Sequence, residues 1–173
     1  MLDPFPIPPP AFLQQALQPL ADALSLPALP SHFHEVLFAI ALYTFIDTIA
    51  SPFVSARLFP KTYPYLDKRT TINWNVHMVS FVQSIIICAL SIYTMLYDQE
   101  RKEMDWAGRV WGYTGMSGLV QAMATGYFAW DFFITLIHLD IFGVGLLAHA
   151  VSALVVFSFG YVSRASTRHK TKM

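Results

Sequence analysis

The chain has 173 residues, of which 55% are apolar and 13% charged, and its formal net charge at pH 7 is zero. Soluble domains carry about 25% charged residues, so this chain has too few charges to cover a soluble surface. Without net charge or a basic cluster interleaved with aromatic residues, we expect no nucleic acid partner. The single cysteine, Cys88, excludes an internal disulfide. No spacing of Cys and His predicts a metal, and no motif predicts a cofactor.

Residues 1–33 form a proline-rich N-terminal segment. Five prolines between residues 4 and 10 favour an extended start. Leu13, Leu17, Leu20 and Leu24 then recur near helical spacing, which predicts a short interfacial helix interrupted by Pro19. The segment lacks the positive start and continuous apolar run of a signal peptide.

Residues 34–162 contain the long apolar stretches of a predicted transmembrane domain. The first stretch, 35–56, is long enough to cross a hydrocarbon core of about 30 Å at about 1.5 Å per residue. Pro52 lies near its end, where a kink is tolerated. A polar loop with four Lys or Arg residues leads to the second stretch, 73–97, which stops at a charged cluster, 98–103.

The last apolar region, 110–161, is almost continuous. It divides into two predicted helices, 111–137 and 141–163, with a break at 138–140. Three shorter crossings would fit the same region. The predicted fold is therefore all-α: a polytopic transmembrane helix bundle of about four spanning helices, or five if the last region divides into three.

Loop charge gives an orientation that conflicts with the helix count. The loop after the first span has Arg57, Lys61, Lys68 and Arg69, whereas the segment before it has neither Lys nor Arg, so this loop should be cytoplasmic. Four crossings would place the basic C-terminal tail, 163–173, on the other side. Either an odd number of crossings or an atypical tail would remove the conflict.

Five ionisable residues fall at membrane depth, where a charge is costly unless it faces protein or water. They are Asp47, His77, Asp131, His138 and His149. Polar residues recur at three- or four-residue spacing on the second, third and fourth spans, so on each span they share a face. We expect the three faces to converge on one lumen. The predicted lumen-facing, lipid-binding residues are His77, Ser80, Ser84, Asp131, Thr135, His149 and Ser152.

In such a lumen, Asp131 could orient a histidine, and a neutral histidine could act as a general base toward a hydroxyl or amine. His77, Asp131 and His149 are therefore the catalytic candidates. The alternative is that these polar groups only hydrogen-bond neighbouring helices. We favour that alternative for Asp47, His138 and the serines of the second span.

A stripe of small residues runs along the third span at three- and four-residue spacing. It lets a neighbouring backbone approach closely, which predicts helix packing. If the neighbour is another chain, the stripe would support a homo- or hetero-oligomer. The predicted packing residues are Gly112, Gly115, Gly118, Ala122 and Gly126.

Several of these segments resemble the TLC (TRAM–LAG1–CLN8) family, and within it the small fungal and TMEM56-like members. The resemblance covers about residues 36–160. It rests on WNVHMVS at 74–80, WGY at 111–113 and LAHAVS at 147–152, and above all on GYFAWD at 126–131. The last of these looks like the family's GYFxWD signature.

The resemblance implies a multi-helix protein of an internal membrane, the endoplasmic reticulum first of all, with membrane lipids as partners. The family is linked to lipid synthesis, sensing or trafficking. Its best-defined enzymes are ceramide synthases, which carry adjacent histidines where this chain has His149 and Ala150. We therefore expect a role in lipid homeostasis without catalysis. The alternative is an acyltransferase-like enzyme of the sphingolipid type, with His149 as base and Asp131 as its partner.

The C-terminus departs from this resemblance. Similar family members continue past the position of Gly160 with further hydrophobic helices, whereas here the basic tail follows. We expect a truncation or an altered reading frame, which would leave the lumen incomplete and would account for the orientation conflict.

Overall fold

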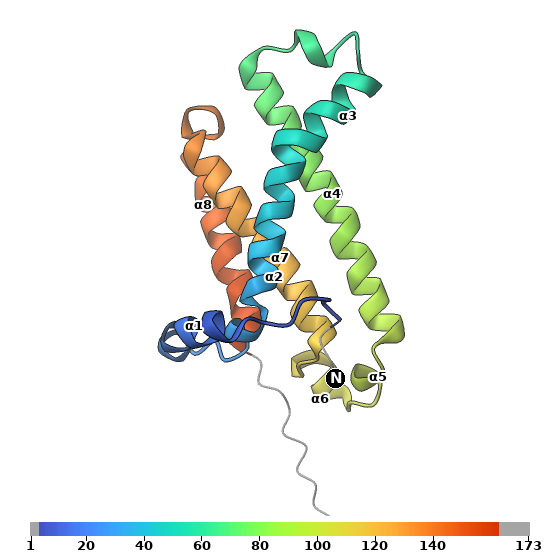
Figure 1. Cartoon of the computed structure of the whole chain (residues 1–173), viewed down its shortest axis with the longest axis vertical. Coiled ribbons are helices and arrows are strands. Elements are labelled where there is room, and N and C mark those ends of the chain that lie inside the picture. Colours follow the sequence, from blue (N-terminus) through green and yellow to red (C-terminus); the bar gives the residue numbers. More distant parts are fainter. Residues whose placement is uncertain (1–3, 163–173) are drawn as a thin grey trace, which may run out of the picture.

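The computed structural model describes residues 4–162, and every regular element in that range is a helix. Four helical stretches are long and apolar enough to cross a membrane (Figure 1). They are Leu29–Leu58, Lys68–Tyr97, Trp106–Ile137 and Leu139–Val162. The prediction of an all-α bundle with four spans is confirmed. The division at residues 33 and 162 stays a prediction, and the tail lies outside the described residues.

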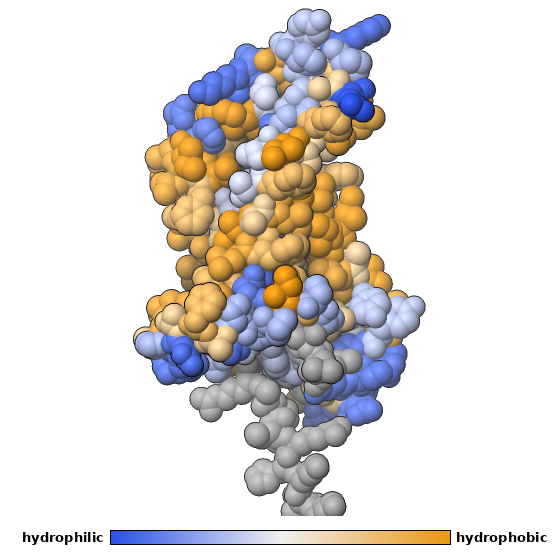
Figure 2. Space-filling view, in the orientation of Figure 1, coloured by the Kyte–Doolittle hydropathy of each residue, from blue (hydrophilic) through white to orange (hydrophobic). Residues whose placement is uncertain are grey.

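The surface has the polarity of a membrane protein. On the face drawn in Figure 2, a broad apolar band crosses the middle of the molecule between two more polar ends. Large side chains such as Phe81, Ile92, Phe133 and Val144, from the second, third and fourth spans, are exposed. Apolar surface of this extent is stable in hydrocarbon and not in water. The chain is therefore an integral membrane protein.

Helix α1 (Ala11–Leu24) lies across one end of the bundle, here called the α1 end (Figure 1). It packs against the beginning of α2 and buries Ala21, while Phe12 and Leu24 stay exposed. The expected interruption is wrong, because α1 runs through Pro19. Packing on α2 offsets the missing backbone donor of this proline, which costs about 3 kcal/mol in a helix interior.

The first span begins earlier than predicted. Helix α2 (Leu29–Phe45) starts at Leu29 because a proline, Pro30, occupies its first turn. A π-helical turn, η1 (Ile46–Ala50), follows, and α3 (Ser51–Leu58) completes the span. The π turn lies directly before Pro52, whose ring excludes a regular α-helical turn there.

The second span is a single helix, α4 (Lys68–Tyr97), which also begins before its predicted start. A short 3₁₀ turn, η2 (Tyr63–Tyr65), precedes it. The Ser51 and Tyr63 hydroxyls both donate hydrogen bonds to Asn75 Oδ1, each with a length of 2.9 Å. These two bonds connect α3 and the loop to α4. The charged cluster after α4 contains the short helix α5 (Gln99–Lys102).

The third span is broken near its start. The short helix α6 (Trp106–Trp111) ends at Gly112, and α7 (Gly115–Ile137) begins after Thr114, whose side chain accepts a hydrogen bond from the Ser117 amide. The predicted continuous helix from residue 111 is therefore wrong. This cap satisfies an amide that a continuous helix would bond internally.

The predicted break at 138–140 is confirmed, since α7 ends at His138 and α8 (Leu139–Ser158) turns back. Gly143 interrupts α8 with a φ of 75°, a backbone conformation that favours glycine. A 3₁₀ turn, η3 (Phe159–Val162), ends the described chain.

Helix α7 is the centre of the bundle, since α2, α4 and α8 all pack against it. The small-residue stripe makes this possible on the α2 side. A side chain at Gly118 would meet the His32 ring, and one at Gly126 would meet Ala39. Gly112 lies before α7, in the broken part of the span. Association with a second chain through the stripe stays a prediction.

Candidate functional site

Two of the three catalytic candidates lie on neighbouring helices, α7 and α8. Asp131, half-buried on α7, interacts electrostatically with His149 on α8. His149 itself is exposed. Nearer the α7–α8 turn, Asp47 of η1 and His138 form a second pair of this kind. Within residues 4–162, no three His, Cys, Asp or Glu side chains gather as a metal site would need.

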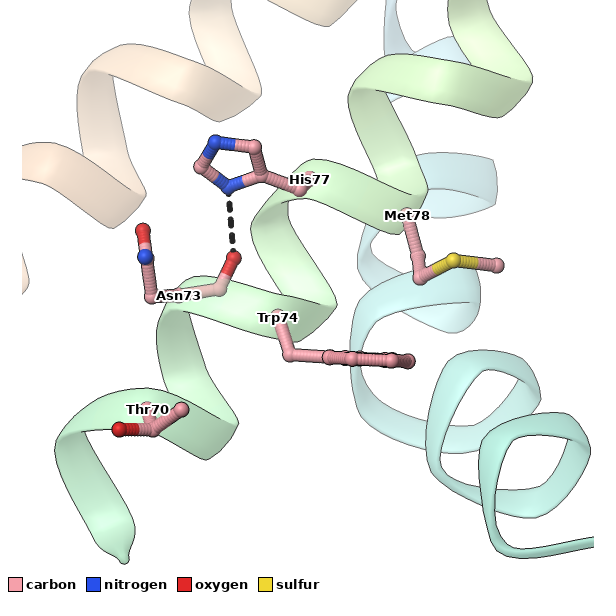
Figure 3. Close-up of a pocket in the computed structure, with 5 residues that line it drawn as sticks. All are labelled: Thr70, Asn73, Trp74, His77 and Met78. Carbon is pink, nitrogen blue, oxygen red and sulfur yellow. Dashed lines mark hydrogen bonds between the residues drawn. The ribbon is translucent and has the colours of Figure 1, made fainter. Parts of the chain in front are cut away.

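His77, the third candidate, lies on an exposed face of α4. Its Nδ1 is 2.8 Å from the carbonyl oxygen of Asn73, one turn earlier on the same helix (Figure 3). Figure 3 shows the His77 and Asn73 side chains on the side of α4 toward the orange-tinted helix, while Trp74 and Met78 lie on the other side. In the described residues the ring makes no hydrogen bond to Asp131 or His149. The shared site of all three therefore stays a prediction.

The other predicted lumen residues are divided between interior and surface. The hydroxyls of Ser80 on α4 and Tyr127 on α7 are 2.9 Å apart and form a hydrogen bond between the two helices. Thr135 is buried. Ser84 and Ser152 are exposed, and each donates to the backbone carbonyl of the residue one turn earlier on its own helix.

A polar layer at the centre of the bundle was not predicted. The Tyr43 hydroxyl of α2 donates to Gln83 Oε1 of α4, and both residues are buried. The Tyr43 ring packs edge-on against Tyr127, 5.5 Å between centroids. Trp130 is 2% exposed beside them, and its Nε1 has no hydrogen-bond partner in the described chain. The polar stripe on α4 indicates this layer, but its partner Tyr43 reads as apolar in the sequence.

A second polar group at the α1 end was also missed. His32 and Glu35, on α2, are 1% and 0% exposed, and their Nδ1 and Oε1 atoms are 3.0 Å apart. The other ring nitrogen of His32 bonds the Tyr113 hydroxyl. The three-residue spacing of His32 and Glu35 places both on one helix face and could have indicated the pair.

An apolar groove of about 620 Å³ lies between α2 and α8, and residues of α7 also line it. Phe33, Val36 and Ile40 line it from α2, and Ala129 and Phe133 line it from α7. Its α8 side is formed by residues 154, 155, 158 and 159. Thr125 and Ser158 are the only polar residues among its described lining. Nearly all of its surface can therefore receive hydrocarbon.

A polar cavity of about 190 Å³ lies at the α1 end. Arg101 of α5 lines it, together with Tyr113, Ser117 and Gln121 of the third span and Tyr161 of η3. The Gln121 side-chain amide donates to the backbone carbonyl of Phe157 and so links α7 to α8. This cavity combines a cation with hydroxyl and amide groups, which are ligands for anionic or polar headgroups.

Comparisons with known proteins cover most of this architecture. The TLC domain of the TRAM, LAG1 and CLN8 family matches residues 73–169, more than half of the chain. An uncharacterized TLC domain-containing protein of Schizosaccharomyces pombe is 37% identical over 153 residues, which are 88% of this chain and 50% of the relative. Topoisomerase I damage affected protein 4 of Saccharomyces cerevisiae is 24% identical over 127 residues, 73% of this chain and 43% of the relative.

The chain thus spans about half the length of the curated relatives that it matches. No solved structure matches it at a significant level. The family match begins at Asn73, so it contains α4 from that residue onward and all of α7 and α8, with His77, Asp131 and His149.

Proposed function

Because this chain belongs to the TLC domain family, we propose that it acts in lipid homeostasis, sensing or trafficking by holding a lipid acyl chain between its helices, without catalysis. We place it in the endoplasmic reticulum, the membrane in which we expect lipid-handling members of the family. Its partners are membrane lipids. Fluorescence of a tagged full-length chain that coincided with the plasma membrane and not the endoplasmic reticulum would contradict that location.

The apolar groove is the observation that carries this proposal. On α2 it extends from Leu29 to Ile40, which is about 16 Å along a helix at about 1.5 Å per residue. Half of a hydrocarbon core of about 30 Å is about 15 Å. The groove therefore has the length of one leaflet and lies on membrane-spanning helices, where acyl chains are the surrounding solvent.

The test is labelling of the full-length chain in membranes by a diacylglycerol with a photoactivatable acyl chain. Ala129→Phe fills the groove floor and should reduce labelling of the groove peptides at least fivefold. Ala148→Phe is the matched control, because Ala148 is exposed on α8 and does not line the groove. Equal labelling of the two variants would refute a chain-binding groove.

One observation favours the acyltransferase alternative, namely the electrostatic interaction between Asp131 and His149. A carboxylate near an imidazole would orient it as a general base once a hydrogen bond joins the two side chains. In this alternative, membranes that contain the chain transfer a labelled acyl group from acyl-CoA to a sphingoid base. His149→Ala should abolish the transfer and Ser152→Ala, one turn later, should not. If the wild-type chain transfers no label, the non-catalytic proposal stands.

A further inference from the structure

We propose that the polar cavity binds the phosphate of a membrane lipid whose acyl chain lies in the apolar groove. The inference rests on the proposed function, because it assigns a headgroup to the lipid held there. It commits to a phosphate-bearing glycerolipid, with Arg101 as the residue that recognises the phosphate.

The cavity and the groove adjoin along two elements. On α7, Gln121 lines the cavity and Thr125, one turn further, lines the groove. The Gln121 amide nitrogen and the Thr125 hydroxyl are 3.5 Å apart. At the other wall, Phe159 borders the groove and Gly160 the cavity. The two hollows are therefore neighbours along both of these walls.

The depth of the two hollows fits a lipid in a bilayer. The cavity lies beside the charged segment 98–105, at the α1 end, where headgroups lie. The groove leads from there toward the middle of the bundle and has about the length of one leaflet. A polar head at the membrane surface and a chain extending inward is the orientation of a bilayer lipid.

Charge selects the headgroup. Arg101 is the only basic residue among the described lining of the cavity, and its guanidinium makes no hydrogen bond or ion pair within residues 4–162. Two carboxylates at this end of the bundle have side-chain partners of their own. Glu35 is bonded to His32, and Asp98 accepts from the Thr114 hydroxyl at 2.5 Å. A guanidinium without a carboxylate partner binds phosphate oxygens in a bidentate, charge-assisted manner.

The experiment is competition against the photoactivatable diacylglycerol on the full-length chain in uncharged detergent. The competitors are phosphatidate and diacylglycerol with identical acyl chains, so they differ only in the phosphate. Phosphatidate should compete about tenfold better. Arg101→Gln should remove this preference and leave competition by diacylglycerol unchanged. Lys102→Gln, which changes the adjacent exposed cation, should keep the preference.

The outcomes separate the two proposals. Equal competition by both lipids, or a preference that survives Arg101→Gln, overturns the phosphate site and leaves the acyl-chain groove intact. Absence of groove labelling overturns the groove and the phosphate site together. Glycerol 3-phosphate is the third competitor. If it competes as well as phosphatidate, the site binds a soluble phosphate ester and the lipid assignment is wrong.

Discussion

Two groups of ionisable side chains in the spanning helices differ in burial and in hydrogen bonding. At the α1 end, His32 and Glu35 are buried and bonded to each other. His77 and His149 instead lie at exposed positions of α4 and α8. A charge-bearing group buried in an apolar helix costs less when a partner is fixed beside it than when it is buried alone. The first pair therefore belongs to the framework, whereas the exposed histidines remain accessible to lipid or to further polypeptide.

Removal of Glu35 should have the largest effect on this contrast. Glu35→Ala leaves His32 buried without its carboxylate, so the free energy of unfolding should fall by about 3 kcal/mol. Titration of the full-length chain with SDS in mixed micelles measures the change. Asp140→Ala, an exposed carboxylate on α8, should change stability by less than about 0.5 kcal/mol. Equal losses in the two variants would contradict the framework role.

Substitution of Gly118, which packs against His32, should give the next largest change in stability. Gly118→Ala places a Cβ against the His32 ring, which should cost about 2 kcal/mol through overpacking. Gly145→Ala is the matched change on α8, where a Cβ would meet nothing within 4 Å. It should raise the free energy of unfolding by up to about 1 kcal/mol through helix propensity. Opposite signs in the same SDS titration are expected, and a stabilising Gly118→Ala would mean that α2 does not approach α7 this closely.

The smallest effects separate the central layer from the exposed face of α4. Tyr127→Phe removes the hydrogen bond to Ser80 and should cost about 1 kcal/mol. His77→Ala removes only a contact within α4 and should stay within about 0.5 kcal/mol of the wild-type chain. Thermal unfolding in detergent, followed by near-ultraviolet circular dichroism, measures which of the two variants loses more stability. A larger loss for His77→Ala would show that its ring has a partner in the folded bundle.

The four spans could be predicted from the sequence because runs of about 20 apolar residues leave few alternatives. Their ends could not, since capping at Thr114 and the proline at residue 30 shift them by several residues. The His32–Glu35 pair was missed for the same reason: the first span was expected to begin at Glu35, which placed His32 outside the membrane. The partner of Gln83 was missed because Tyr43 is counted as an apolar residue, although its hydroxyl is a donor.

The π-helical turn at Ile46–Ala50 determines which face of α3 meets α4. One additional residue in a helical turn rotates everything after it by about 100° about the helix axis. With that rotation Ser51 reaches Asn75, and the Ser55 hydroxyl accepts from Trp74 Nε1 at 2.9 Å. Deleting one residue from the turn would rotate these serines away from α4 and bring Pro52 and Ala56 to the positions that face α4. The π turn thus sets the rotation of α3 about its axis, so that the Ser51 and Ser55 hydroxyls face α4 and not lipid.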